Sequence, residues 1–220
     1  MISTETNRRD FIKTTSIATS GLMMGVVLPS TVSKSIAAGT LHTPNAWVHI
    51  ADDNSITLLS ARSEMGQGVY TSMPMLIAEE LNVDVNKVVI SAAPPGAVYV
   101  NALLGAMITG GSTSVRDGWE KLRIAGAQVR EMLVAGAAAE WGVPASAVKA
   151  ENGMLTGPGG KKATYGSLAA AASKLPVPEK VAIKDPKDFT IVGKPTKRLD
   201  SPAKTNGTAE FGIDVKLPGM

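Results

Sequence analysis

The sequence predicts a mixed α+β or α/β fold, in which one mixed sheet packs with one long helix and several short helices. Two observations support this prediction. Segments typical of strands and helices follow one another in the order strand, strand, helix, strand, and a long amphipathic segment comes next. A chain of 220 residues, 44% of them hydrophobic, is also long and apolar enough to bury the core of one domain or of two small ones.

The first predicted elements are a β-hairpin, a helix and a further strand. Residues 47–50 and 56–60 have the β-branched and apolar composition of two strands joined by a short polar turn. Apolar residues at helical spacing predict a helix over 72–81, with Pro74 in its first turn, where a missing N–H is tolerated. Residues 87–92 then predict another strand, which completes a ββαβ order.

The long helix is expected from Ser114 to Trp141, because its apolar positions recur at a spacing of about 3.5 residues. Gly142 and Pro144 should end it, and a short helical turn follows Pro144. Residues 150–164 contain two glycine-rich turn signals and predict a strand, an exposed turn and another strand. A short alanine-rich helix is expected over 165–174.

The chain after this helix divides into two parts. Residues 176–196 contain four prolines among charged residues and show no sustained period, so we interpret them as a linker that follows a domain over 39–175. Residues 197–220 open a new domain, with a turn and then a strand. Because this strand-like run is passing into a turn at the last residues, we expect the natural protein to continue.

The first 38 residues resemble a signal peptide for twin-arginine export. Arg8 and Arg9 stand two residues ahead of an aromatic–aliphatic pair and Lys13, and a moderately apolar stretch follows. Small residues then favour cleavage after Ala37 or one residue later. Residues 1–38 therefore predict a periplasmic protein, with membrane association left open.

Composition excludes several classes of site. The sequence has no cysteine, so it cannot form disulfides or ligate an iron–sulfur cluster or a Cys-type zinc ion. A net charge of +3 gives no indication of a nucleic-acid partner. The two histidines, His42 and His49, are too few for a metal site on their own, and we interpret both as structural or surface residues.

Two glycine-centred loops precede predicted helices. In the first, Gly66 and Gly68 flank Gln67, whose amide can donate and accept hydrogen bonds, and the N–H groups at the following helix start favour anionic or carbonyl oxygens. The second, residues 110–114, combines bare N–H groups with three hydroxyls and suits a phosphate. Each loop could equally be only a turn or a helix cap. Together they favour one extended, phosphate-bearing ligand.

These motifs carry a resemblance to a known family. Residues 63–68, residues 110–114 with Gly118, and the run from Arg198-Leu199-Asp200 to Asp214 resemble segments of the molybdopterin-binding large subunit of the xanthine dehydrogenase/aldehyde oxidase family. Their order, behind an export signal, is most similar to the isoquinoline 1-oxidoreductase beta-subunit type and to related aldehyde dehydrogenases. The resemblance covers nearly all of the chain after the signal.

The resemblance implies a cofactor and the residues that bind it. The cofactor is molybdenum–molybdopterin, expected in its cytosine dinucleotide form. In the family the glutamine of the first loop lies beside the molybdenum centre, and the second loop faces the pterin and its phosphates. No side chain of this chain is expected to ligate the metal directly. The implied cofactor-binding residues are Gly66, Gln67, Gly68, Gly111, Ser112, Thr113 and Ser114.

The resemblance also assigns the domains. Residues 39–175 correspond to part of the molybdopterin-binding domain, and 197–220 to the start of an α/β hammerhead domain, in which the segment from Arg198 should be structural.

The implied activity is that of an oxidoreductase, a molybdenum hydroxylase that oxidises N-heterocycles or aldehydes with oxygen from water. Electrons would leave through a small partner subunit with [2Fe-2S] clusters, and a cytochrome c is a possible acceptor. The family's catalytic glutamate lies near the C-terminus of a much longer subunit, so this chain alone should not turn over. Glu64 is the candidate substitute for that glutamate in this sequence, and we interpret it as a solvated or loop-bracing carboxylate. The alternatives are a non-catalytic periplasmic phosphate- or nucleotide-binding module and an inactive remnant.

Overall fold

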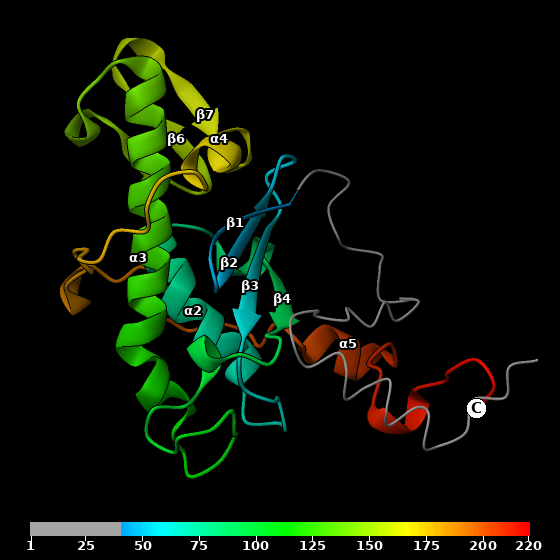
Figure 1. Ribbon diagram of the computed structural model, residues 1–220. Coiled ribbons are helices and arrows are strands. Elements are labelled where there is room, and N and C mark those ends of the chain that lie inside the picture. The colour runs from blue at the N-terminus through cyan, green and yellow to red at the C-terminus, as the bar shows by residue number, and fades with distance from the viewer. Residues whose placement is uncertain (1–40) are drawn as a thin grey trace, which may run out of the picture. The chain divides into compact units, whose positions relative to one another are not determined.

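The computed structural model describes residues 41–220 (Figure 1), so the predicted export signal with Arg8, Arg9 and Ala37 lies outside the described residues. A four-stranded sheet in the order β1-β2-β3-β4 forms one layer. Strand β2 (Val48–Ala51) pairs antiparallel with β1 (Leu41–Asn45) on one side and with β3 (Ile56–Ser60) on the other. Strand β4 (Val89–Ala92) pairs with β3 in parallel, which confirms the predicted mixed sheet.

Two helices cover the sheet. Helix α2 (Val69–Leu81) connects β3 to β4 and lies between the sheet and the long helix α3 (Ser114–Trp141) in Figure 1. The bounds of α3 are the predicted ones, and Gly142 ends it in the left-handed conformation. The largest fully buried apolar side chains are Tyr165, Ile50, Leu58, Met73, Ile77, Leu81, Leu122, Leu133, Leu155 and Leu168.

A small antiparallel sheet follows α3. Its strands are β5 (Lys149–Glu151), β6 (Met154–Thr156) and β7 (Lys162–Thr164), and helix α4 (Tyr165–Ala172) comes next. The buried hydroxyl of Tyr165 donates to the carbonyl of Leu81 at 2.9 Å, and Asn82 donates to the carbonyl of Ala150 at 2.9 Å. The small sheet and α4 are thereby fixed to the end of α2. The sequence predicted two strands over 150–164, but the Asn152-Gly153 turn divides the first of them into β5 and β6.

Helix α2 begins three residues earlier than predicted. Gly68 takes the left-handed conformation with φ 88°, so the chain turns there and the helix starts at Val69. Pro74 therefore lies beyond the first turn, and the carbonyl of Tyr70, four residues earlier, has no helical donor.

The strand predicted after Arg198 is wrong. Residues Ser201–Asn206 form helix α5, which begins with Pro202 in its first turn and ends at Gly207 with φ 79°. Farther on, Gly212–Asp214 form a 3-10 turn. A strand needs a neighbour to pair its N–H and C=O groups, and no strand of the described residues lies beside this segment. Ile213 is accordingly 93% exposed.

The segment interpreted as a linker, 176–196, has little regular structure apart from a 3-10 turn at Pro186–Asp188. It is nevertheless bonded to α2 at several points. The buried carboxylate of Glu79 accepts hydrogen bonds from the N–H groups of Thr190, Ile191 and Val192. Among residues 41–220, no helix is both long enough and apolar enough to cross a membrane.

Candidate cofactor-binding site

The predicted loops meet near the carboxyl ends of the two parallel strands. Ser60 ends β3, Ala92 ends β4, and the N–H of Ala93 donates to the carbonyl of Ser60 at 2.8 Å. The carboxyl ends of parallel strands are where α/β sheets commonly bind ligands. A hollow of about 400 Å³ opens here. Its lining is Ser60, Ala61, Arg62, Ser63, Met65, Tyr70, Ala92, Ala93, Met107, Ile108 and Thr109.

One hydrogen bond joins the two loop regions directly. The N–H of Ser63, at the start of the first loop, donates to the hydroxyl of Thr109 at 2.9 Å. Thr109 immediately precedes the second loop, 110–114. The structure therefore brings close together two segments whose bonded residues are 46 positions apart in the sequence.

The N–H groups of the first loop are already bonded to a carboxylate of this chain, that of Glu64. The carboxylate of Glu64 accepts hydrogen bonds from the N–H groups of Gly66 at 2.8 Å, Gly68 at 3.0 Å and Tyr70 at 3.1 Å. The expectation that this helix start offers free N–H groups to a ligand is therefore wrong, because Glu64 occupies the positive end of α2.

Glu64 braces the loop, as one of the two sequence interpretations held. Its side chain is only 8% exposed, so the solvated alternative is wrong. Burial opposes its ionisation and is the largest single effect. The N–H groups of Gly68, Tyr70 and Gly66 together outweigh it, so the pKa of Glu64 lies below its usual value.

Gln67 is exposed, but its amide is bonded within its own loop. Its Oε1 accepts from the N–H of Met65 at 2.5 Å, and its Nε2 donates to the carbonyl of Ser63 at 2.8 Å. An amide carries two donors and two acceptor lone pairs, so one donor and one lone pair are left for a ligand. At Gly66 and Gly68, a Cβ atom would meet nothing within 4 Å, which leaves open space over the backbone.

The second loop presents two of its three hydroxyls outward. Thr113 is buried, and its hydroxyl accepts from Asn101 Nδ2 at 2.6 Å and donates to the carbonyl of Gly110 at 2.7 Å. Its side chain shapes the loop and does not face a ligand. Ser112, held at φ 52°, is exposed, and Ser114 is half-buried at the first position of α3.

The start of α3 fits an anionic oxygen. Within residues 41–220, no side chain caps its first turn by a hydrogen bond, so the N–H groups of its first residues have no acceptor among these residues. At Gly110 a Cβ would meet nothing within 4 Å, so a ligand can approach the backbone. Uncapped N–H groups, two hydroxyls and an open glycine together form a donor set suited to a phosphate group.

A buried ion cluster fixes this helix start to the end of β3, and it was not anticipated from the sequence. Asp117, whose side chain is 3% exposed, accepts from Arg62 at 2.7 Å, from Lys121 at 3.0 Å and from the N–H of Ala102 at 2.8 Å. Burial opposes the ionisation of Asp117 most strongly, but the donors from Lys121 and Ala102 and the charges of Lys121 and Arg62 outweigh it and lower its pKa.

Arg62 also lines the hollow, and its Nε is a buried donor with no hydrogen-bond partner among the described residues. A buried donor without a partner is costly. A water or ligand atom that reaches it from the hollow would remove that cost.

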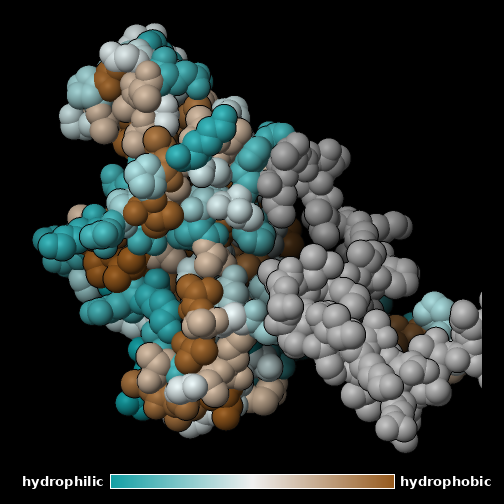
Figure 2. Space-filling model, in the orientation of Figure 1, coloured by the Kyte–Doolittle hydropathy of each residue, from teal (hydrophilic) through white to brown (hydrophobic). Residues whose placement is uncertain are grey.

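Apolar side chains surround the second loop. Figure 2 shows apolar surface over the first turns of α3 and the loop that precedes it. The exposed apolar residues there are Val98, Leu103, Leu104, Met107, Ile108, Val115 and Trp119, and Met65 of the first loop is 69% exposed.

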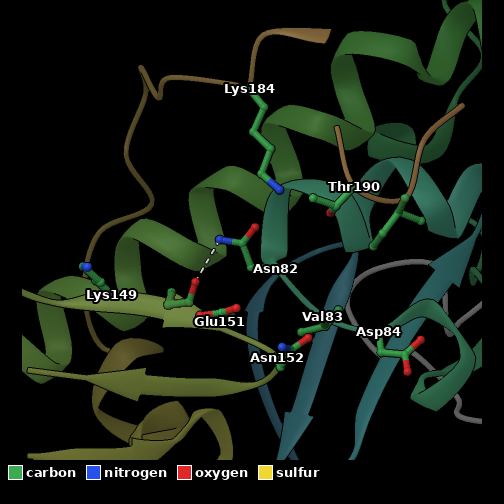
Figure 3. Close-up of a pocket in the computed structure, with 10 residues that line it drawn as sticks. Asn82, Val83, Asp84, Lys149, Glu151, Asn152, Lys184 and Thr190 are labelled. Atoms are coloured by element: carbon green, nitrogen blue, oxygen red, sulfur yellow. Dashed lines mark hydrogen bonds between the residues drawn. The ribbon is translucent and has the colours of Figure 1, made fainter. Parts of the chain in front are cut away.

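A second hollow, of about 690 Å³, contains none of the predicted site residues. Figure 3 shows it between the end of α2, strand β5 and the 184–191 segment, with the Asn82–Ala150 hydrogen bond across it. Its charged groups are partly paired already, since Lys184 contacts Glu79 at 2.7 Å. Within 41–220, no group of three or more His, Asp or Glu side chains is arranged to hold a metal ion.

The two histidines have structural surroundings, as predicted. His42 contacts Asp52 at 2.6 Å across the β1–β2 hairpin. His49 lies in β2, and burial lowers its pKa.

Comparison with known proteins shows the family to which the chain belongs. The family model of the molybdopterin cofactor-binding domain matches residues 3–215. Isoquinoline 1-oxidoreductase subunit beta from Brevundimonas diminuta is 31% identical over 81% of this chain and 27% of its own length. A membrane-bound aldehyde dehydrogenase (pyrroloquinoline-quinone) from Gluconacetobacter polyoxogenes is 34% identical over 97% of this chain and 28% of its own length.

The chain thus spans roughly a quarter of the length of these relatives, 27% and 28%. Among solved structures, quinoline 2-oxidoreductase from Pseudomonas putida 86 matches 64% of this chain and 19% of its own, with 20% identity and a TM-score of 0.43. The assignment does not depend on that distant likeness, because the family model covers nearly all of the sequence. The chain belongs to the molybdopterin cofactor-binding domain family.

Proposed function

We propose that this chain is the cofactor-binding N-terminal part of the large subunit of a molybdenum hydroxylase. The observation that carries the proposal is the meeting of the two loops through the Ser63–Thr109 hydrogen bond, at the carboxyl ends of β3 and β4. One loop offers an oriented amide, and the other offers uncapped N–H groups and hydroxyls. A ligand that spans both needs a phosphate at one end and a polar reactive centre at the other.

In this proposal the two loops bind different ends of the cofactor. The start of α3, with Ser112 and Ser114, holds the phosphate of molybdopterin, and the open space at Gly110, next to Gly111, lets the ligand approach the backbone. Gln67 directs its remaining donor and lone pair at the molybdenum end, with Gly66 and Gly68 leaving space above the loop. When bound, the cofactor supplies the redox centre at which a substrate carbon is hydroxylated with oxygen from water.

The wall of the hollow supports the proposed substrate class. Met65, Met107 and Ile108 give it apolar sides, while Arg62 and Ser63 give it polar groups. Small planar N-heterocycles and aldehydes have this same combination of an apolar body and a few polar atoms. Turnover assays with both substrate types, in the intact enzyme, decide between them.

A sequence without cysteine cannot ligate iron–sulfur clusters through thiolates, so such clusters would belong to another chain or to a part of the protein outside these 220 residues. We place [2Fe-2S] clusters in a small partner subunit and a cytochrome c as the acceptor. Co-purification of a chain with iron and labile sulfide tests the first assignment. Reduction of added cytochrome c tests the second. Release of CMP from acid-treated protein tests the cytosine dinucleotide form of the cofactor.

The protein is exported to the periplasm by the twin-arginine route, with Arg8 and Arg9 as the recognised pair. That route carries folded proteins, which suits a cofactor inserted before export. Cell fractionation checks this: cofactor-loaded protein found only in the cytoplasm of the native host would contradict it.

The phosphate end of the site is tested with a charge. Ser114→Asp places a carboxylate at the first position of α3, where an acidic residue stabilises a helix, so the fold should survive. The same carboxylate repels a phosphate. We expect bound pterin and molybdenum to fall about tenfold or more in the intact enzyme. Ser167→Asp is the matched control, because Ser167 lies in the first turn of α4, is exposed, and lies outside both loops.

The molybdenum end is tested with Gln67→Ala. Loss of one oriented polar group should leave cofactor content nearly unchanged while turnover falls by roughly ten- to a thousandfold. Full cofactor content and full activity in both Ser114→Asp and Gln67→Ala would show that the loops are ordinary turns. Phosphate-ligand binding without any molybdenum, in a host that makes the cofactor, would favour the non-catalytic binding module instead.

A further inference from the structure

The Gly-Gln-Gly loop depends on a residue far away in the sequence. Arg198 Nη1 donates to the carbonyl of Gly66 at 2.7 Å, and its Nη2 donates to the carboxylate of Glu64 at 3.0 Å. Glu64 in turn holds the N–H groups of Gly66 and Gly68. The loop is therefore bonded from both sides, its N–H groups to Glu64 and the carbonyl of Gly66 to Arg198.

Arg198 is itself fixed in place. Its Nε and Nη2 donate to the two carboxylate oxygens of Asp200 at 3.1 and 3.0 Å, and Asp200 also accepts from Lys204. Hydrogen bonds from Arg198 first and then from Lys204 lower the pKa of Asp200 to about 2, so it stays ionised. The next residue is anchored as well, because the N–H of Leu199 donates to the hydroxyl of Thr71 in α2 at 3.0 Å.

The contact pattern requires a guanidinium. Three acceptors, the Gly66 carbonyl and the carboxylates of Glu64 and Asp200, lie in different directions around one planar group. A planar fork with five N–H donors can serve all three at once, whereas the compact ammonium of lysine cannot hold the same geometry.

We propose that Arg198 and Glu64 form a two-residue brace that positions Gln67, so that Arg198 is a positioning residue of the cofactor site. The inference rests on the proposed function, because the orientation of Gln67 matters for turnover only if it lies at the bound cofactor. With the brace intact, the carbonyl of Ser63 and the N–H of Met65 stay where they hold the amide of Gln67. Without Arg198, Gly66 and one side of Glu64 are released.

The brace also couples two regions of the chain. Asp200 and Lys204 belong to the segment that forms α5, and together with Glu64, Gly66 and Tyr70 they line a hollow of about 770 Å³. A movement of the segment after Arg198 is thereby transmitted to the loop through one side chain.

The first experiment measures the loop itself, without reference to activity. Hydrogen exchange of the N–H groups of Gly66, Gly68 and Tyr70 is compared in wild type and Arg198→Ala, in protein without cofactor. We expect exchange of these amides to become at least about tenfold faster, because Glu64 loses its fixed partner. Exchange over 122–133 of α3 should not change. Lys187→Ala, which removes an exposed positive charge elsewhere, is the control and should leave the loop protected.

The second experiment measures the consequence in the intact, cofactor-loaded enzyme. We expect Arg198→Ala to keep its molybdenum and pterin, to lower kcat about ten- to a hundredfold, and to change KM little. Arg198→Lys should resemble the alanine variant, because charge without the fork cannot make the three contacts. Added guanidinium at millimolar concentration should restore part of kcat to Arg198→Ala and none to Arg198→Lys.

The outcomes separate the brace from the proposed function. Unchanged exchange in Arg198→Ala, or full activity of Arg198→Lys, overturns the brace even if Gln67→Ala is inactive. If Gln67→Ala is fully active, the proposed function fails, although faster exchange in Arg198→Ala still establishes the brace. Should Arg198→Ala not fold, Arg198→Lys decides: wild-type exchange and wild-type kcat in that variant overturn the proposal, and faster exchange with lowered kcat supports it.

Discussion

Asp117 illustrates how single buried residues determine the geometry of this site. Its carboxylate accepts hydrogen bonds from the side chain of Arg62 just after β3, from the N–H of Ala102 in a loop, and from the side chain of Lys121 one turn along α3. The guanidinium of Arg62 is 1% exposed, so it depends on Asp117 for a counter-charge. Removing one member of a buried pair leaves the other as an unpaired charge, and this cost exceeds the net value of the pair.

We therefore expect Asp117→Asn to lower the free energy of unfolding by about 3 kcal/mol. The substitution retains the shape and the acceptor for Ala102, but it removes the charge that Arg62 and Lys121 face. Urea unfolding followed by circular dichroism measures the change. Asp188→Asn, at an exposed position, is the control and should shift stability by less than about 0.5 kcal/mol. Equal stability of the two variants would show that Arg62 finds another partner.

At this scale the sequence singles out residues that stand in short local motifs and misses residues whose contacts are made across long sequence distances. Gln67, Ser112 and Ser114 stand in short motifs whose composition indicates ligand binding. Arg62 and Asp117 do not, because their roles arise from contacts across 55 positions. Arg198 was expected to be merely structural, and nothing in its neighbourhood indicates that its guanidinium reaches the carbonyl of Gly66.

Helices α2 and α3 pack closely against each other. At Gly126 of α3, a Cβ atom would lie 2.4 Å from the carbonyl oxygen of Ile77 and 3.1 Å from Glu80 Cβ. Backbone therefore contacts backbone at this crossing, and only glycine fits. The crossing matters for the candidate site, because it packs α3, which follows the second loop, against α2, which follows the Gln67 loop.

Two glycines of α3 give opposite predictions for the same substitution. Gly126→Ala should lower the free energy of unfolding by about 1 kcal/mol or more, since overpacking costs about 1–3 kcal/mol and outweighs the gain in helix propensity. Gly136→Ala should raise it by about 0.5–1 kcal/mol, because its Cβ would meet its nearest neighbour at an ordinary 3.7 Å. Thermal unfolding of both variants checks the pair. If Gly126→Ala were instead more stable than wild type, the two helices would be able to move apart at this crossing without loss of stability.

The elements were predictable where their signals are local. Helix α3 has a long apolar period and a Gly142 that stops it, and both of its ends were predicted correctly. The helix at 201–206 was missed, although Pro202 and Gly207 are typical start and stop signals, because the apolar alternation at Phe211, Ile213 and Val215 suggested a strand. Alternation predicts a strand only if a neighbouring strand exists, and a single sequence does not reveal that. Phe211, Ile213 and Val215 are all exposed.

On the scale of the whole described unit, the irregular segment 182–192 is held to the helices by two adjacent buried carboxylates. Glu80 contacts Arg123 at 2.8 Å and the N–H of Lys184 at 3.1 Å. Glu79 accepts from Lys184 Nζ at 2.7 Å and from three successive N–H groups, those of Thr190, Ile191 and Val192. Charge-assisted hydrogen bonds thus hold this segment to α2, in addition to the packing of Ile191 and Val192 against the core.

Because of this attachment, the free energy of unfolding should decrease as the pH falls. Burial opposes ionisation of Glu79 and is the largest single effect. The donors of Lys184, Val192, Ile191 and Thr190 outweigh it and lower the pKa from 4.5 to about 2. Because the folded-state pKa is below the unfolded one, the ionised carboxylate stabilises the fold fully above about pH 4.5, and this contribution is lost as the pH falls towards 2. The contribution is on the order of 3 kcal/mol.

Glu79→Gln tests this dependence, since it keeps the shape of the side chain and removes its charge. We expect wild type to exceed the variant by roughly 3 kcal/mol in the free energy of unfolding at pH 7, and the difference to shrink steadily below pH 4.5. Urea titrations at pH 7, 5, 4 and 3 measure it, and hydrogen exchange at Ile191 and Val192 shows whether the segment is released first. Glu179→Gln, an exposed change in the neighbouring segment, should give no such pH dependence. A difference between wild type and Glu79→Gln that stays constant from pH 7 to pH 3 would mean that Glu79 acts by packing rather than by charge.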